Sequence, residues 1–148
     1  MAKLFITLAI LTVFGAVLVN GFDKNAAVTA FMAKMDDCKA EVGAKDSDVE
    51  DLVGKKPSST MEGKCLRSCL MKKYEVMDTN GKFLKDVAAT HAHKYTDGSE
   101  DRMKIAHEII DNCSSIEVAD DHCEAAEQYG KCFKEQAMAH NIKDDFDY

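Results

Sequence analysis

The stretch Lys64–Lys73, KCLRSCLMKK, contains two cysteines four residues apart, Cys65 and Cys69. It follows the sequence Ser59-Thr60-Met61-Glu62, a capping box, and the pattern predicts a helix from there to about Met77. Residues four apart on a helix lie about 40° from each other around its axis, so both thiols face the same way. Thiols one turn apart rarely meet disulfide geometry, so the pair is suited to attach this helix to two different partners.

Four more cysteines, Cys38, Cys113, Cys123 and Cys132, complete a set of six. An even set in a short secreted chain is typical of three disulfides, whereas the same thiols in a reducing compartment would indicate a metal site. Cys123 and Cys132 are nine residues apart, which places them on opposite faces of one helix, so they must bond to different partners. Spacing alone leaves fifteen possible pairings.

The N-terminus decides the compartment. Lys3 is the only charge before Asp23, and an apolar stretch follows it up to Val19-Asn20-Gly21. The stretch is short for a membrane span and ends in residues suited to cleavage. We therefore interpret residues 1–21 as a signal peptide and residues 22–148 as one secreted, extracellular domain with a short acidic tail from about residue 140.

Apolar residues elsewhere recur at steps of three and four, and no segment shows sustained alternation. The sequence therefore predicts an all-α fold of six helices. Besides the cysteine-bearing helix, we expect helices at about 23–43, from the capping box Ser47-Asp48-Val49-Glu50 to Gly54, around 84–95, from Ser99 to Cys113, and from Asp120 or Asp121 to about Ala137.

Composition excludes several functions. The net charge is −7, and removal of Lys3 with the leader makes it one unit more negative. Nucleic acids and anionic membranes need clustered Lys and Arg, so we expect neither as a partner, and no stable membrane association. The sequence has no Gly-x-Ser-x-Gly, His-Glu-x-x-His or phosphate-binding glycine loop, and Asp78-Thr79-Asn80-Gly81 departs from a calcium loop. We expect no catalytic residues, metal or cofactor.

The cysteine pattern resembles that of the insect odorant-binding proteins, the six-helix family that includes the pheromone-binding and general odorant-binding proteins. The resemblance rests on one cysteine in the first helix, the Cys-x3-Cys pair and the Cys-x8-Cys pair. Local segments are also similar, closest to the fly pheromone-binding-related subgroup: Cys38–Glu41, Lys64–Lys73, Met77–Lys82 and Asp121–Ala126. The interval of 43 residues between Cys69 and Cys113 is long for the family, and we place the extra residues near Asp97.

The resemblance implies the disulfides Cys38–Cys69, Cys65–Cys123 and Cys113–Cys132 around an internal apolar cavity. Cross-links of this kind supply stability that a filled core would otherwise provide. The expected ligand-binding residues are Phe31, Met35, Leu70, Met77, Phe83, Leu84, Val87, Ala88, Met103, Ala106, Ile109, Ile110, Ala126, Tyr129 and Phe133.

Each of these residues has an alternative interpretation as ordinary core. Met is suited to a surface that accepts ligands of different shapes, but a Met at helical spacing is more often core packing. His91, His107 and Tyr129 are candidates for a hydrogen bond to a ligand oxygen if they reach the cavity.

Two functions remain open at this point. The first is a carrier of small hydrophobic odorants or pheromones through sensillar lymph, with an odorant receptor as a possible partner. The second is a non-olfactory carrier or scavenger of lipids or hormones in another body fluid. In either case we expect a monomer or weak dimer.

Overall fold

A computed structural model of the protein describes residues 23–142, so the expected signal peptide (1–21) and most of the acidic tail lie outside the described residues. The described chain forms six helices and no strand, which confirms the all-α prediction. The helices are α2 (Lys24–Val42), α3 (Asp46–Val53), α4 (Met61–Lys73), α5 (Lys85–Tyr95), α6 (Glu100–Ser114) and α7 (His122–Ala139). Among residues 23–142, no helix combines the length and hydrophobicity that a membrane span needs.

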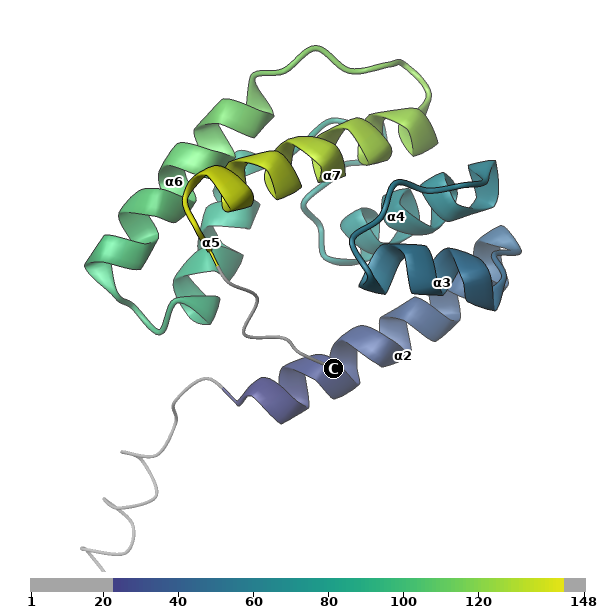
Figure 1. The fold of residues 1–148 in the computed structure, drawn as a ribbon, viewed down its shortest axis with the longest axis horizontal. Helices are drawn as coiled ribbons and strands as arrows, with labels where there is room; N and C mark the ends of the chain where they lie inside the picture. Colours follow the sequence, from purple (N-terminus) through teal and green to yellow (C-terminus); the bar gives the residue numbers. More distant parts are fainter. Residues whose placement is uncertain (1–22, 143–148) are drawn as a thin grey trace, which may run out of the picture.

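Helix α7 links two groups of helices (Figure 1). It packs against α4 along one side and against α6 along the other, while α2 and α3 pack on α4 and α5 packs on α6. The chain therefore has an α2–α4 group and an α5–α6 group that α7 joins.

Three disulfides hold these groups. Cys38–Cys69 joins α2 to α4, Cys65–Cys123 joins α4 to α7, and Cys113–Cys132 joins α6 to α7. They are the pairs that the family resemblance implies, and no described cysteine is free. Cys65 and Cys69, one turn apart on α4, bond to different helices, as the sequence predicts.

The buried apolar residues form two core clusters. The first contains the buried residues Met35, Cys38, Ala44, Leu66, Cys69 and Leu70 from the α2–α4 part of the chain. The second contains Met77, Phe83, Ile110, Ala125, Ala126 and Tyr129. The first cluster therefore lies within the α2–α4 group, whereas the second lies around α7, between α6 and the segment before α5.

The prediction that the cysteine-bearing helix extends to Met77 is wrong, because α4 ends at Lys73. Glu75 has a positive φ of 58°, which no helix continues through, and the amide groups of Val76 and Met77 turn back to the carbonyl of Met71. Met77 then pairs with Phe83 in an isolated antiparallel bridge. Tertiary burial decides the boundary here, since the bridge places both side chains in the second cluster.

The helix starts also differ from the predicted capping boxes. Helix α3 begins after Lys45, whose amide donates to Asp48 Oδ2 at 2.8 Å, so Ser47 lies inside the first turn instead of capping it. Helix α4 begins after Thr60, one residue later than predicted, and Thr60 Oγ1 accepts the amide of Gly63 at 3.0 Å. The Thr60 hydroxyl in turn donates to Asp48 Oδ1.

Asp48 therefore connects α3 to the start of α4. Its side chain is buried, and the carboxylate accepts from the Lys45 amide and the Thr60 hydroxyl. These hydrogen bonds, the backbone one first, hold the pKa of Asp48 below its usual value. A Cβ at Gly63 would lie 3.1 Å from Asp48 Oδ1, so the junction has little spare room.

Replacing Asp48 with Ala should lower the free energy of unfolding by about 1–3 kcal/mol near neutral pH, because two donors lose their acceptor in a buried position. A carboxyl with a lowered folded-state pKa stabilises the protein above its unfolded value of about 3.9 and loses that contribution as pH falls through the folded value. The difference between Asp48→Ala and wild type should therefore shrink as pH falls below about 3.9, measured by urea unfolding with the disulfides intact.

The exposed Asp37 provides the matched control. Asp37→Ala should change the free energy of unfolding by less than about 0.5 kcal/mol both near neutral pH and at acidic pH. Equal effects of the two substitutions would contradict a structural role for the Asp48 carboxylate.

Candidate functional site

A pocket of about 1150 Å³ lies between the two core clusters. Leu70 reaches it from the first cluster, and Phe83, Ile110 and Ala126 reach it from the second. All six helices contribute to its wall, whose side chains are mostly aliphatic or aromatic. The pocket is the space that the α2–α4 group and the α5–α6 group leave between them under α7.

The structure places nine of the fifteen expected ligand-binding residues in this wall: Phe31, Leu70, Phe83, Ala88, Ala106, Ile109, Ile110, Ala126 and Phe133. They come from α2, α4, α5, α6, α7 and the segment before α5. Residues far apart in the sequence thus meet around one volume, as a ligand pocket requires. Their contact with a ligand stays a prediction.

Three of the other six expected residues are core residues. Met35 is fully buried in the first cluster. Met77 is buried in the second cluster, where its sulfur accepts from Ser68 Oγ at 3.7 Å. Tyr129 packs against Phe83 with ring centroids 5.4 Å apart. These side chains support the wall from behind instead of lining it.

The other three, Leu84, Val87 and Met103, are half-buried outside the wall. Leu84 is the N-cap of α5 and not part of the helix. On α5 and α6, the wall is rotated from the expected stripe, so that Ala92 and Ile105 face the pocket. The apolar stripe of each helix is wider than its pocket-facing part, so periodicity alone does not separate the two.

Sequence reasoning missed several wall residues. They are Ala27, Val28, Leu52, Arg67, Met71, Tyr74, Val76, Ala92, Thr96, Arg102, Ile105, Gly130, Asn141 and Ile142. Three more lie at or near the C-terminal ends of α5 and α7: Tyr95, Ala137 and His140. On α7 the wall follows Ala126, Gly130 and Phe133, with Gly130 in place of the expected Tyr129. A glycine inside a helix often marks close approach of another group, which was the available signal.

The methionines do not form the wall. Of the residues expected for their adaptable shape, Met35 and Met77 are core and Met103 lies outside, and Met71 is the only described methionine that lines the pocket. Alanine, branched aliphatic and aromatic side chains form it instead, so the wall is stiffer than a Met-rich surface.

Four aromatic rings form a continuous row along the wall. Phe31 stacks on Tyr74 with centroids 6.4 Å apart, Tyr74 meets His91 edge-on at 5.8 Å, and His91 stacks on Tyr95 at 6.4 Å. His91 Nε2 lies 2.9 Å from the carbonyl oxygen of Tyr74, which can only accept, so Nε2 carries the proton. The row connects α2 to α5 across the end of α4.

His107 is exposed and outside the wall, so of the three polar candidates only His91 lines the pocket. His140 and Asn141 lie where α7 ends, together with the exposed Arg102 and Ile142. His140 Nε2 is 3.6 Å from Glu108 Oε1. Polar groups therefore gather at the rim of the pocket.

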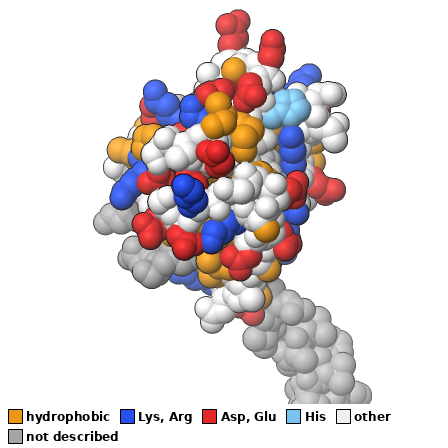
Figure 2. All heavy atoms as spheres, turned by 90° about the vertical axis from the view of Figure 1, so that its right-hand side faces the viewer, with side chains coloured by type: hydrophobic (Ala, Val, Ile, Leu, Met, Phe, Trp, Pro, Cys, Tyr) orange, Lys and Arg blue, Asp and Glu red, His pale blue; other side chains and the backbone are white. Residues whose placement is uncertain are grey.

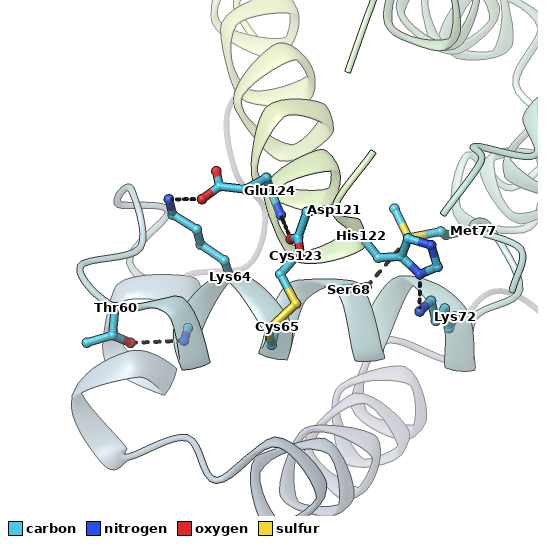
Figure 3. The surroundings of a disulfide bond; sticks show 11 residues. Thr60, Lys64, Cys65, Ser68, Lys72, Met77, Asp121, His122, Cys123 and Glu124 are labelled. Carbon is cyan, nitrogen blue, oxygen red and sulfur yellow. Dashed lines mark hydrogen bonds and ion pairs between the residues drawn. A yellow bond between two sulfur atoms is a disulfide. The ribbon is translucent and has the colours of Figure 1, made fainter. Parts of the chain in front are cut away.

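A second, smaller hollow of about 570 Å³ lies beside the Cys65–Cys123 bond and is lined largely by charged and polar groups. Figure 3 shows this region, where Lys72 Nζ lies 2.9 Å from His122 Nδ1 and Lys64 Nζ lies 2.8 Å from Glu124 Oε1. The hydrogen bond to Glu124 raises the pKa of Lys64. The side chains here pair with one another, whereas the larger pocket is apolar and is the candidate binding site.

The model of the PBP/GOBP family matches residues 22–136 of the chain. The protein belongs to the PBP/GOBP family. General odorant-binding protein 28a of Drosophila melanogaster is 44% identical over 137 residues, which cover 93% of this chain and 96% of that protein. General odorant-binding protein 19d of the same species is 37% identical over 107 residues, 72% of this chain and 71% of that protein.

A solved structure of odorant-binding protein 28a from Drosophila melanogaster superimposes with a TM-score of 0.73 at 44% identity. The match covers 82% of this chain and 100% of that chain. These comparisons confirm both the family resemblance and the fold of this PBP/GOBP member.

If the pocket of this PBP/GOBP protein is open space, a larger side chain at its wall should be tolerated. Ala106→Leu extends into the pocket, and we expect its free energy of unfolding to stay within about 1 kcal/mol of wild type. Ala125 is buried in the second cluster and does not line the pocket, so Ala125→Leu should destabilise the protein by about 1–3 kcal/mol. Urea unfolding measures both.

Equal destabilisation by the two leucines would contradict an open pocket beside Ala106. A stabilised Ala106→Leu would agree with it, because a side chain that enters apolar space gains contacts.

Proposed function

We propose that this protein is a secreted carrier that binds small hydrophobic odorants or pheromones in the pocket between the two core clusters. It would take up poorly soluble molecules, transport them through aqueous lymph and deliver them to odorant receptors. The observation that carries the proposal is a large, mostly apolar pocket in a chain of the PBP/GOBP family.

The physical basis is the transfer of apolar ligand surface out of water. Each CH₂ group that a ligand buries contributes about 0.8 kcal/mol, so a chain of roughly ten to twenty carbons can bind through burial alone. Pockets for small molecules commonly have volumes of about 300–1,000 Å³, and the one here, at about 1150 Å³, is slightly larger. Uncharged apolar molecules fit this wall best.

The rim offers a route for exchange. Tyr95 and Ile142 line the pocket and are each more than two-fifths exposed, so apolar surface is continuous from the rim into the interior. A ligand can therefore enter along apolar contacts. The face that Figure 2 shows is suited to solution, since acidic and basic side chains are interspersed on it.

The charges and pairings of the described residues support a carrier more than an enzyme. The pocket holds aromatic and aliphatic groups, and His91 donates to a backbone carbonyl. We propose that the protein works as a monomer or weak dimer. The reason is that its large exposed methionines lie on different helices: Met32 on α2, Met61 on α4 and Met138 on α7.

The alternative is a carrier of lipids or hormones outside the olfactory system. The two relatives named above are both general odorant-binding proteins, which favours the odorant carrier. Comparison of transcript levels in antennae and in other tissues distinguishes the two, since an olfactory carrier requires expression in antennae.

Phe133 provides the direct test of the pocket. Its ring lies in the wall, 5.4 Å from the ring of Phe83, and we expect Phe133→Ser to weaken binding of the fluorescent probe N-phenyl-1-naphthylamine by about tenfold to a hundredfold. The reason is the loss of a contact surface comparable to burying one Phe, about 1.5–3 kcal/mol. Fluorescence titration measures the affinity, and circular dichroism checks that helix content is unchanged.

Met138 on the same helix is largely exposed and outside the pocket, so Met138→Ser is the matched control and should bind the probe like wild type. Equal affinities of the two variants would contradict binding in this pocket.

A further inference from the structure

Arg67 is a cation in the wall of a mostly apolar pocket, whose other arginine, Arg102, is exposed at the rim. It lies in the middle of α4, its side chain is 15% exposed, and it lines the pocket together with Gly130 of α7. A charged group at such a site needs hydrogen-bond or ion-pair partners for its N–H donors.

Two of the three guanidinium nitrogens have partners in the protein. Nε donates to Ser58 Oγ at 2.7 Å and lies 3.0 Å from Glu127 Oε2, and Nη2 donates to the carbonyl of Lys56. Glu127 also accepts from the amide and the hydroxyl of Ser58, at 2.9 and 2.8 Å. The guanidinium is thereby fixed between the segment before α4 and helix α7.

The third nitrogen, Nη1, has no hydrogen-bond acceptor among residues 23–142. No fully buried side-chain nitrogen or oxygen in this part of the chain lacks a partner, so Nη1 must keep accessible surface. It also lies 3.7 Å from the position that a Cβ of Gly130 would occupy, at the pocket wall. Its two N–H groups are therefore open to a ligand, and the absent side chain of Gly130 leaves room for one.

We propose that Arg67 Nη1 is a specificity-determining donor that selects ligands with a carbonyl oxygen, namely long-chain aldehydes, ketones or esters. This proposal rests on the proposed carrier function and adds the ligand class. Arginine has donors and no acceptor, so an acceptor-only group satisfies it fully.

The other head groups fit less well. A hydroxyl bound to Nη1 can satisfy the arginine but leaves its own O–H in apolar surroundings, which is unfavourable. A carboxylate meets a guanidinium whose charge Glu127 already balances, and the neighbouring pair Lys64–Glu124 is balanced as well. An alkane displaces water from Nη1 and leaves the donor unpaired.

Lys134 on α7 is a nearby cation that does not replace Arg67. Lys134, one turn after Gly130, donates to the carbonyl of Lys55 at 2.7 Å and lies outside the pocket wall. It therefore provides a control for charge in this region without a donor in the pocket.

The experiment compares an aldehyde, an alcohol, a carboxylate and an alkane of one chain length as competitors of N-phenyl-1-naphthylamine. In the wild-type protein the aldehyde should compete about threefold to tenfold better than each of the others, the range expected for one net hydrogen bond. Arg67→Lys keeps a cation beside Glu127, but a single ammonium cannot hold Ser58 and Glu127 and also face the pocket. It should reduce the aldehyde-to-alkane ratio to about one.

Gly130→Ala is the second variant, because it leaves Arg67 unchanged. The new methyl group would stand 3.7 Å from Nη1, an ordinary contact, and should reduce the same ratio by covering the donor. The control Lys134→Gln should keep the wild-type ratio.

A wild-type protein that binds the probe and the alkane but does not prefer the aldehyde would overturn the Arg67 proposal and leave the carrier function standing. An undiminished ratio in both Arg67→Lys and Gly130→Ala, or a preference for the carboxylate, would also overturn it. A protein that binds neither the probe nor the alkane would contradict the carrier function itself.

Discussion

The arrangement depends on the attachment of α7 to α4 by the Cys65–Cys123 disulfide, which joins residues 58 apart in the sequence. Helix α7 is also bonded to α6 through Cys113–Cys132. One helix therefore connects the α5–α6 group to the α2–α4 group, with a disulfide to each of them. Disulfides of this kind each contribute about 2–4 kcal/mol by restricting the unfolded chain. The two core clusters can then lie apart, with a pocket between them that packing alone would tend to close.

Ionic and polar contacts orient the helices that the disulfides connect. Near the Cys65–Cys123 bond, Lys64 pairs with Glu124, and one turn further along α4 Arg67 pairs with Glu127. The Lys72 ammonium lies beside His122 Nδ1, while the His122 ring occupies the space above Gly81, where a Cβ would come within 2.6 Å of it. This interface sets the side of α7 that faces the pocket, and so brings Gly130 opposite Arg67.

Much of the fold could be predicted from the sequence, because helix periodicity and cysteine spacing are local signals. The cysteine pairing followed from the family resemblance, since the spacing alone left fifteen possibilities. The end of α4 could not be predicted, because the bridge between Met77 and Phe83 is a tertiary interaction that overrides a continuing helical pattern.

The pocket was harder to predict than the core. Residues on one apolar stripe either fill a cluster or face the pocket, and a rotation of about 100° decides which, as Tyr129 and Gly130 illustrate. The surroundings of Arg67 were beyond sequence reasoning as well, because they depend on Ser58 in the loop before α4 and on Glu127 of α7, which is far away in the sequence.

In the proposed complex, a ligand occupies the space between the two clusters. Methyl NMR of the protein with a bound saturated hydrocarbon tests it most directly, through nuclear Overhauser effects between ligand and protein. We expect such effects at Leu70, Ile105 and Ile109, which line the pocket, and none at Leu66, which is buried in the first cluster outside the wall. Effects confined to exposed groups such as Met32 and Met138 would contradict it.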